Sequence, residues 1–514
     1  MPYGRATVGL AVFVVAFAVY VLTAPQGLRA YEPETAALTE GFVRTGEFQI
    51  IEDSPMATSP GVRGKDGKLV GRVGLPQPVA EAPFYLAGWT LDTVANSDYR
   101  YRKKAMLLFN GFVMALVAAL VFLISEQLQG SRRWSIAIAF LFAFASLAWP
   151  YSKIGAESMV TLGFALALWA ALIARGSPKL WPWALAGFGA GMAVAAKQYA
   201  LVPIAAMTLV VWPAWRADAS RRIARLAAVA VPFAAWMVAM LYYNWERTGS
   251  IFKTANSEYS ATWAAPVNLI GFLVSPGKGL LWYSPLVVLG VLGVVVLWRE
   301  DRKLAVALTA VFVAGLCVVA IVPHWSDETW GPRYLMPVAW LPLLAIPFWA
   351  TTRRRVKVVG AVAAVAVVVQ LVAIVAPFTQ VVKSTEGLTG IPLFEQREPG
   401  QEKTAPFGRD SIRWIPQLSP LLTQSALVVS RAATVVGLPP ITLRYAPYEG
   451  AAHRLTLSED FAEEVGFIRP DFWWLQRDAG KAGVLAALLA VLAALTAGRV
   501  IRREWRASRT VAVG

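Results

Sequence analysis

The hydrophobic positions of this chain fall in long continuous runs separated by short polar links. A membrane-spanning helix needs about 20 apolar residues. Twelve runs come near that length; two are short and poorly separated, so we expect eleven to thirteen spans. The runs cover residues 7–24, 105–126, 134–150, 156–174, 181–196, 198–215, 223–243, 282–298, 304–323, 334–350, 356–377 and 482–501. The pattern predicts an all-α polytopic membrane protein.

Composition agrees with this interpretation. Of the residues, 57% are hydrophobic and 16% charged, with a mean hydropathy of +0.52, which excludes an ordinary soluble domain. The single cysteine, Cys317, excludes a disulfide framework and a cysteine-based zinc site. The first apolar run, 8–22, could be a cleaved signal peptide. Because "TAPQGLRA" after it lacks a small-x-small cleavage site, we expect a retained first helix.

Charge divides the links between the runs into two classes. Every second link is short and basic: "GSRR" (130–133), "RGSPK" (175–179), "WRADASRRIAR" (215–225), "WREDRK" (298–303), "TTRRRVK" (351–357) and the tail "RVIRREWRASR" (499–509). The positive-inside rule makes these links and both termini cytoplasmic in a multi-pass membrane protein. The net charge of +16 then follows largely from topology, so a nucleic-acid partner is not needed.

The remaining links are predicted to face outside, and they carry most of the mass beyond the membrane. The first, 25–104, contains a short surface helix within 29–48, a hairpin or lid at 61–74 and an amphipathic stretch at 76–95. The predicted organisation is a transmembrane core (1–377), an external loop or small external domain (378–480), and a final helix with a basic tail (481–514). The alternative for 378–480 is a mobile connection.

Candidate chemistry begins directly after the first span. Glu32 and Glu34 open the surface helix, where a carboxylate could accept a proton, or where both acids could simply favour the helix dipole. A second external link, "WPYSKIGAES", holds Lys153 and Glu157.

Two further external segments combine basic and aromatic residues. "SPGKGLLWYSP" (275–285) places Lys278 in a glycine-rich turn before Tyr283; such a turn can cradle phosphate, although an interfacial lysine can also be a snorkelling anchor. "HWSDETWGPRYLMP" (324–337) places Arg333 at the start of a span, where it could bind phosphate in a bidentate manner. It could instead pair with Asp327 or Glu328.

His324 opens the same segment but has no partner ligands in the sequence. The chain has only two histidines, so we expect an ordinary hydrogen-bonding side chain there and predict no metal site.

These motifs, in this order, resemble the bacterial C-type (GT-C) membrane glycosyltransferases of the protein O-mannosyltransferase and aminoarabinose-transferase families. Relatives start the first external loop with a Gly-Asp-Glu-Pro-like stretch, matched here by "AYEPETAALTEGFVRTGEF". They also carry "WPYSK" followed by an acid, "SPGKGLLWYSP" and "W…GPRYLLP", matched at 149–157, 275–285 and 330–337; the match covers about residues 7–350. Tyr31 stands where the family's usual aspartate is expected, which leaves Glu32 and Glu34 as alternatives for its role.

The resemblance implies a GT-C-like enzyme with a polyprenyl-phosphate-linked sugar donor and an active site on the external, periplasmic face. Membrane lipids would surround the polyprenyl tail, and a cell-envelope glycan, lipid or protein would be the acceptor. A first-loop carboxylate would take the acceptor proton, while Lys153, Lys278 and Arg333 would hold the phosphate. A single displacement would invert the anomeric configuration. The sugar, the acceptor and any need for a divalent metal stay open.

Other classes of function stay open as well. A transporter or lipid flippase would use the external acids as gating groups; its broken helices and polar residues would lie near mid-membrane, often in two related halves, and the sequence shows no internal repeat. A membrane scaffold would bind partners through its last loop. A ligase or polymerase of lipid-linked glycans would use the same external site with a pyrophosphate donor.

Overall fold

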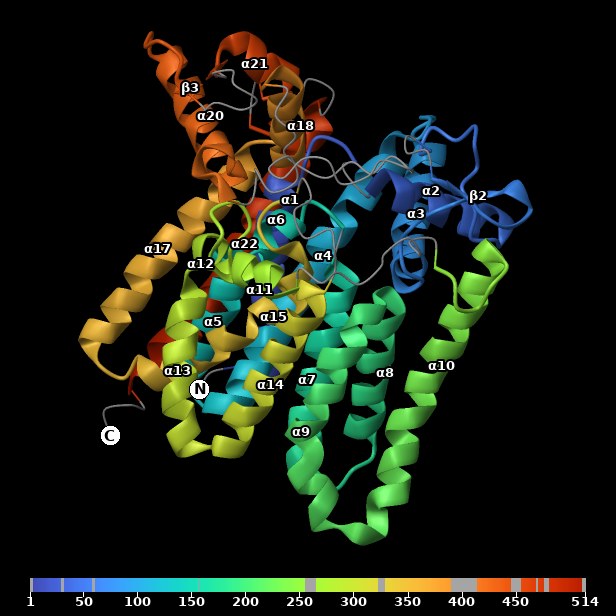
Figure 1. Cartoon of the computed structure of the whole chain (residues 1–514), viewed down its shortest axis with the longest axis vertical. Helices are drawn as coiled ribbons and strands as arrows, with labels where there is room; N and C mark the ends of the chain where they lie inside the picture. Colours follow the sequence, from blue (N-terminus) through green and yellow to red (C-terminus); the bar gives the residue numbers. More distant parts are fainter. Residues whose placement is uncertain are drawn as a thin grey trace.

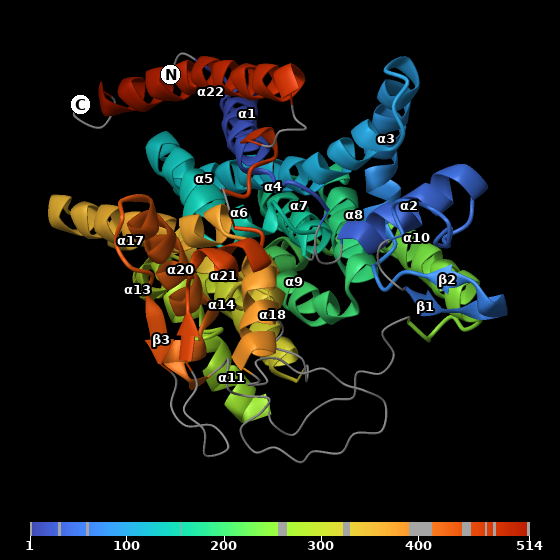
Figure 2. The same ribbon diagram turned by 90° about the horizontal axis from the view of Figure 1, so that it is seen from above.

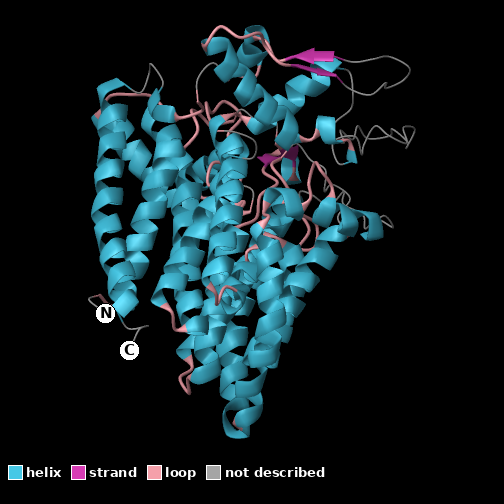
Figure 3. Cartoon of the chain, turned by 90° about the vertical axis from the view of Figure 1, so that its left-hand side faces the viewer, coloured by secondary structure: helices cyan, strands magenta, loops and turns pink. Residues whose placement is uncertain are grey.

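The computed structural model describes residues 3–28, 32–57, 61–155, 157–254, 265–321, 329–389, 414–444, 454–467, 470–475 and 480–510. In this part of the chain nearly all regular structure is helical, and the two short β-hairpins lie at one end of the helices (Figure 3). That end, uppermost in Figure 1, is called the upper end below.

Eight helices in the described residues are long and apolar enough to cross a membrane. They are α1 (Arg5–Thr23), α4 (Arg100–Gln129), α7 (Ser158–Gly176), α9 (Leu201–Ala217), α10 (Arg222–Thr248), α14 (Arg302–Ala320), α17 (Arg353–Val375) and α22 (Gly480–Thr510). The chain is therefore an all-α, multi-pass membrane protein, as its hydrophobic pattern predicts.

The other four predicted spans form shorter or interrupted helices. They are α5 (Arg132–Ala145) followed by α6 (Ala148–Tyr151); α8 (Trp181–Ala196); α13 (Leu286–Glu300); and the pieces η4 (Arg333–Leu335), α15 (Met336–Ala339), η5 (Leu341–Ala345) and α16 (Ile346–Trp349). Proline lacks a backbone N–H and clashes with the preceding turn. Pro337, Pro342 and Pro347 therefore divide the predicted span 334–350, and its irregular backbone is tolerated because residues 330–346 are buried in protein.

Helix α4 lies at the centre of the bundle, packed against α1, α5 and α7. Helix α8 packs between α7 and α10, and α9 lies against α7 and α14 (Figure 1). Fully buried residues of α4, such as Met114, Val117 and Ala118, belong to one continuous hydrophobic core. Close helix packing uses small residues, as where Gly163 of α7 meets Gly189 and Ala193 of α8.

The basic links gather at the opposite, lower end. Arg175 forms an ion pair with Asp301 at 2.8 Å, and Arg221 donates to the Pro178 carbonyl at 3.0 Å, so three of the links meet there. Arg132, between α4 and α5, pairs with Glu126 and with Glu504 of α22. The grouping of links predicted from charge is thus present, and both termini lie in the lower half of Figure 1. Which membrane face this end occupies stays a prediction.

Two units cover the upper end and lie on different sides in the view from above (Figure 2). The first consists of α2 (Glu32–Thr45), β1 (Val62–Arg63), η1 (Lys65–Gly67), β2 (Leu69–Val70) and α3 (Pro76–Val94). Strand β1 pairs antiparallel with β2, with Val62 opposite Val70. The predicted surface helix, hairpin and amphipathic stretch are therefore present, and α2 is followed by Gly46 in the left-handed region, with φ of 75°.

The second unit, called the cap, follows α17. It contains α18 (Phe378–Thr389), η6 (Pro416–Leu418), α20 (Pro420–Val435), β3 (Thr442–Arg444), β4 (Arg454–Thr456) and α21 (Glu459–Glu464). Residues such as Val381, Leu427, Leu455 and Phe461 form a hydrophobic core separate from that of the bundle. The chain returns to α22 through η7 (Trp473–Leu475), while α11 (Ala265–Val274) and α12 (Leu280–Tyr283) connect α10 to α13.

Candidate functional site

The two predicted acids at the start of α2 face different neighbours. Glu32 is buried, and its Oε1 accepts a hydrogen bond of 3.1 Å from Nδ2 of Asn110 in α4. Asn110 also accepts from the hydroxyl of Ser158, at the start of α7, at 2.9 Å. Glu34 faces the first-loop hairpin: it accepts from the backbone N–H of Arg72 and lies 3.9 Å from the Arg72 guanidinium. Both acids are thus held in place from outside their own helix.

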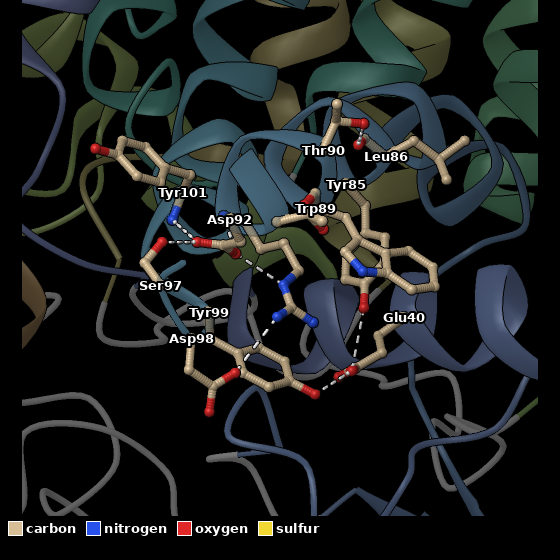
Figure 4. A network of polar contacts seen from close by, with 12 residues as sticks. Glu40, Tyr85, Leu86, Trp89, Thr90, Asp92, Ser97, Asp98, Tyr99 and Tyr101 are labelled. Atoms are coloured by element: carbon tan, nitrogen blue, oxygen red, sulfur yellow. Dashed lines mark hydrogen bonds and ion pairs between the residues drawn. The ribbon is translucent and has the colours of Figure 1, made fainter. Parts of the chain in front are cut away.

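A third acid, Glu40, fixes α2 on its neighbours (Figure 4). It is fully buried, and its Oε1 accepts from the hydroxyls of Tyr85 at 3.1 Å and Tyr99 at 2.7 Å. Arg44 donates to the same oxygen at 3.0 Å, and the Ser54 hydroxyl donates to the other. Because Tyr85 belongs to α3 and Tyr99 precedes α4, Glu40 joins three helices and thereby orients the first turn of α2.

Three basic residues from distant parts of the sequence line one cavity beside the loop that Glu34 holds. The cavity has a volume of about 40 Å³, and its basic residues are Arg72 of the first loop, Lys197 at the end of α8 and Arg247 near the end of α10. Gln198, Asn244 and Thr254 add neutral polar groups. Three cations that converge on a polar cavity form a site for an anion such as phosphate.

Arg247 is the most rigidly held of these cations. Its side chain is buried, donates to the backbone carbonyls of Gly71 and Val73, and donates to Oδ1 of Asn244 at 3.3 Å. The guanidinium carbon also lies 3.6 Å from the centre of the Tyr243 ring. This side chain therefore ties the first loop to the upper end of α10 and fixes one wall of the cavity.

Glu157 is a second acid that lies beside a cation of this cavity. It precedes α7 and is buried; its Oε2 accepts from the Tyr199 hydroxyl at 2.7 Å, and its Oε1 lies 3.9 Å from Nζ of Lys197. Oε1 accepts no hydrogen bond from any described residue. The cavity is thus flanked by two carboxylate–cation pairs, Glu34 with Arg72 and Glu157 with Lys197.

Arg333 is connected to Glu157 through two tyrosines, Tyr334 and Tyr199. It is buried at the start of η4, and it donates to the Tyr334 hydroxyl at 2.7 Å. The ring of Tyr334 packs edge-on against that of Tyr199, with 6.2 Å between centroids, and Tyr199 in turn holds Glu157. The predicted phosphate role of Arg333 stays a prediction. Its predicted partners Asp327 and Glu328, together with His324, lie outside the described residues.

Lys153 and Lys278, also predicted to hold phosphate, are directed to protein groups in this structure. Lys153 is buried and donates to Asp471 Oδ2 at 3.1 Å and to the Ile374 carbonyl at 2.9 Å. Lys278 donates to the carbonyl of Thr329. Lys153 thus connects the bundle to the chain that enters and leaves the cap, and a phosphate role for both lysines stays a prediction.

Tyr283, the aromatic candidate, lies where the bundle contacts the cap; Tyr283 and Trp330 are called the seat of the cap below. Its ring packs edge-on against Trp330, with 5.0 Å between centroids, and its carbonyl accepts from Gln370 at 2.6 Å. The backbone N–H of Leu421 in α20 donates to its hydroxyl at 3.2 Å. Gly331, with φ of 58°, must be glycine because a Cβ there would lie 2.8 Å from the Tyr283 ring. Three of the sequence motifs therefore meet under the cap.

Arg72, Lys197 and Arg247 were not candidates in the sequence analysis. Arg247 carried the clearest signal, because a charged residue at the end of an apolar helix is costly unless it is paired or functional. Among the described residues, no three His, Cys, Asp or Glu side chains come together as a metal site would require.

No protein-family model and no curated protein matches the chain. Among solved structures, the chain is similar to the "Crystal Structure of ArnT from Cupriavidus metallidurans bound to Undecaprenyl phosphate", with a TM-score of 0.47 and 13% sequence identity. The similarity covers 85% of this chain and 72% of that chain.

Proposed function

We propose that this protein is a C-type membrane glycosyltransferase. It transfers a sugar from a polyprenyl phosphate to a hydroxyl of a cell-envelope glycan, lipid or protein at the upper end of the bundle, which faces the outside of a bacterial plasma membrane. One observation carries the proposal: Arg72, Lys197 and Arg247 converge on one cavity flanked by two buried carboxylates, Glu34 and Glu157. The resemblance of the sequence motifs to this enzyme family supports it.

The charges suit the chemistry of such a donor. When the acceptor oxygen attacks the anomeric carbon, the bond from that carbon to the phosphate oxygen breaks, and the phosphate leaves as an anion. The three cations stabilise the charge that develops on it. The lipid phosphate is already a good leaving group, so no strong general acid is required. A single displacement of this kind inverts the anomeric configuration.

The acceptor hydroxyl must lose its proton to a nearby base. We assign this role to Glu34 rather than Glu32, because Glu34 adjoins Arg72, which lines the cavity and whose side chain is 43% exposed. Glu32 is bonded to Asn110 within the seam between α2 and α4. Glu157, held by Tyr199, keeps Lys197 directed towards the phosphate.

The test compares three isosteric variants, Glu34→Gln, Glu157→Gln and Glu32→Gln, in purified full-length protein. Polyprenyl-phosphate binding and sugar transfer from a radiolabelled lipid donor are measured separately. We expect Glu34→Gln to lose transfer by roughly 10²–10⁴-fold, the scale of a general base, with donor affinity kept. Glu157→Gln should weaken donor binding, and Glu32→Gln should change either quantity little.

Loss of transfer in Glu32→Gln alone would move the base two residues along the helix. Unchanged transfer in all three variants would refute the enzymatic proposal for this cavity.

A further inference from the structure

One buried carboxyl of the first-loop unit plays no part in the proposed reaction. Glu81 of α3 is 3% exposed and faces α2. Its Oε1 accepts from Nε2 of Gln77 at 3.1 Å, and its Oε2 lies 3.2 Å from the hydroxyl oxygen of Thr39. A charged carboxylate in this setting would need several donors or a cation.

The hydrogen atoms available around Glu81 can be counted. The Thr39 hydroxyl oxygen lies 2.9 Å from the carbonyl oxygen of Thr35, which can only accept, and Thr39 has a single hydroxyl hydrogen. With that hydrogen directed to Thr35, the contact between Thr39 and Glu81 becomes a hydrogen bond only when Glu81 carries a proton and donates it. Every group of the cluster is then satisfied.

The neighbouring elements supply no compensating charge. Helix α3 packs on α2, α4 and α8. Helix α8 has no titratable side chain. The titratable side chains nearest the contact between α3 and α2 come from α2, α4 and the adjoining segment 153–157: Glu32, Glu34, Glu40, Arg44, Arg102, Lys103, Lys104, Lys153 and Glu157. The cations Arg44, Arg102 and Lys153 pair with Glu40, Asp92 and Asp471. Among the described residues, none is ion-paired with Glu81.

Glu40, on the same helix as Thr39, shows how a charged acid is accommodated in this unit (Figure 4). It is as deeply buried as Glu81, but it receives a guanidinium and three hydroxyl donors. Two acids of equal burial therefore have opposite surroundings, one suited to a carboxylate and the other to a carboxylic acid.

We propose that Glu81 is a protonated carboxylic acid at neutral pH that locks α3 to α2, and that its deprotonation in alkaline solution releases this lock. Burial raises the pKa of Glu81 from 4.5 to about 8, and the contacts with Gln77 and Thr39 offset only part of that effect. Because the folded-state pKa is the higher one, the stabilisation is complete below the unfolded value and is lost as the pH rises through about 8.

The test is hydrogen–deuterium exchange of the α2 peptides in the full-length protein in lipid nanodiscs, with the wild type and Glu81→Gln compared at equal pH. A glutamine can donate to Thr39 and accept from Gln77, so it imitates the protonated acid at every pH. Comparison at equal pH also cancels the base catalysis of exchange. Glu40→Gln is the matched control at an equally buried acid.

The wild type should already open more than Glu81→Gln at about pH 6, and the difference should grow by at least about tenfold by about pH 9, because the opened state releases the proton above pH 4.5 whereas the folded state holds it up to about pH 8. Glu40→Gln should loosen α2 at both pH values. Equal exchange of wild type and Glu81→Gln across this range would overturn the lock, as would faster exchange in Glu81→Gln at about pH 6.

The consequence for activity rests on the proposed function, because α2 carries Glu32 and Glu34. Transfer should fall above pH 8 in the wild type and persist in Glu81→Gln. If the exchange difference is found but no transfer occurs with any lipid donor, the lock stands and the proposed function fails. If transfer occurs but no exchange difference is found, the proposed function stands and the lock fails.

Discussion

Arg247 makes several contacts at once, so the kind of cation at this position should matter as much as its charge. Its guanidinium bonds the carbonyls of Gly71 and Val73 while it lines the cavity. A lysine offers three donors on a flexible stem and lacks the planar fork. The same side chain thus shapes the loop and supplies charge, and the two contributions can be separated by substitution.

We expect Arg247→Lys to weaken polyprenyl-phosphate binding by roughly tenfold, about 1.4 kcal/mol, and Arg247→Ala by about 2–4 kcal/mol. Binding is followed by titration of the labelled lipid in detergent. Arg431→Ala is the control, since Arg431 pairs with Glu459 within the cap and its loss should leave affinity unchanged. Wild-type affinity in Arg247→Ala would show that this arginine only supports the loop.

Of the cavity and the acids beside it, only Glu34 and Glu157 were candidates from the sequence, and the residues explain why. Glu32 and Glu34 were both candidates, but they are two residues apart in a helix and so point about 160° away from each other. Only the docking of α2 decides which one meets Arg72. Lys153 and Lys278 lie in recognisable motifs, yet a motif does not reveal that the chain leaving the cap supplies the partner of Lys153. Arg72, Lys197 and Arg247 meet only because two helix ends and a loop converge.

Among the elements, the broken segment from η4 to α16 differs most from its prediction. Its apolar composition indicated one span, and its prolines interrupt that span. Helix α13 crosses it at small residues: a Cβ at Gly290 would overlap the Pro342 carbonyl, and one at Gly293 would overlap that of Ala345. The long runs were predicted correctly because one uninterrupted helix satisfies their backbone, whereas here neighbouring elements must do so.

Gly293→Ala should destabilise the protein by about 1–3 kcal/mol, because the backbone carbonyl of Ala345 can move away only if the whole segment shifts. Gly360→Ala in α17 is the matched control. A Cβ at Gly360 meets nothing within 4 Å, and the gain in helix propensity should stabilise by up to about 1 kcal/mol. Thermal unfolding in detergent measures both. An equal effect of the two substitutions would contradict close packing between α13 and η5.

The arrangement of the whole molecule gives a test of orientation. The basic links lie at the lower end and the candidate site at the upper end, so the positive-inside rule places the site outside. In a Cys317→Ser background, Ala95→Cys beyond α3 and Arg354→Cys at the start of α17 are exposed positions at opposite ends. An impermeant maleimide should label Ala95→Cys in intact cells, and Arg354→Cys only after permeabilisation. The opposite pattern would invert the topology.

The cap can be removed with little disturbance of the bundle because the chain leaves and returns at one place. The N–H of Asp471 donates to the carbonyl of Val375 at 3.0 Å, so the two ends of the cap are neighbours. Just beyond, the indoles of Trp473 and Trp474 donate to the carbonyls of Val21 and Leu22 at the upper end of α1. A deletion should therefore spare residues 470–475, whose contacts belong to the bundle.

We expect replacement of residues 377–468 by a short glycine–serine linker to preserve donor binding, because Arg72, Lys197 and Arg247 all lie outside the replaced stretch. Transfer to the native acceptor should fall, since the cap covers the upper end beside the seat formed by Tyr283 and Trp330. The matched control keeps the cap and carries Asp471→Asn, which weakens its attachment to Lys153 without removing surface. Full transfer by the linker variant would show that the cap has no part in acceptor use, and loss of donor binding would show that it supports the cavity from a distance.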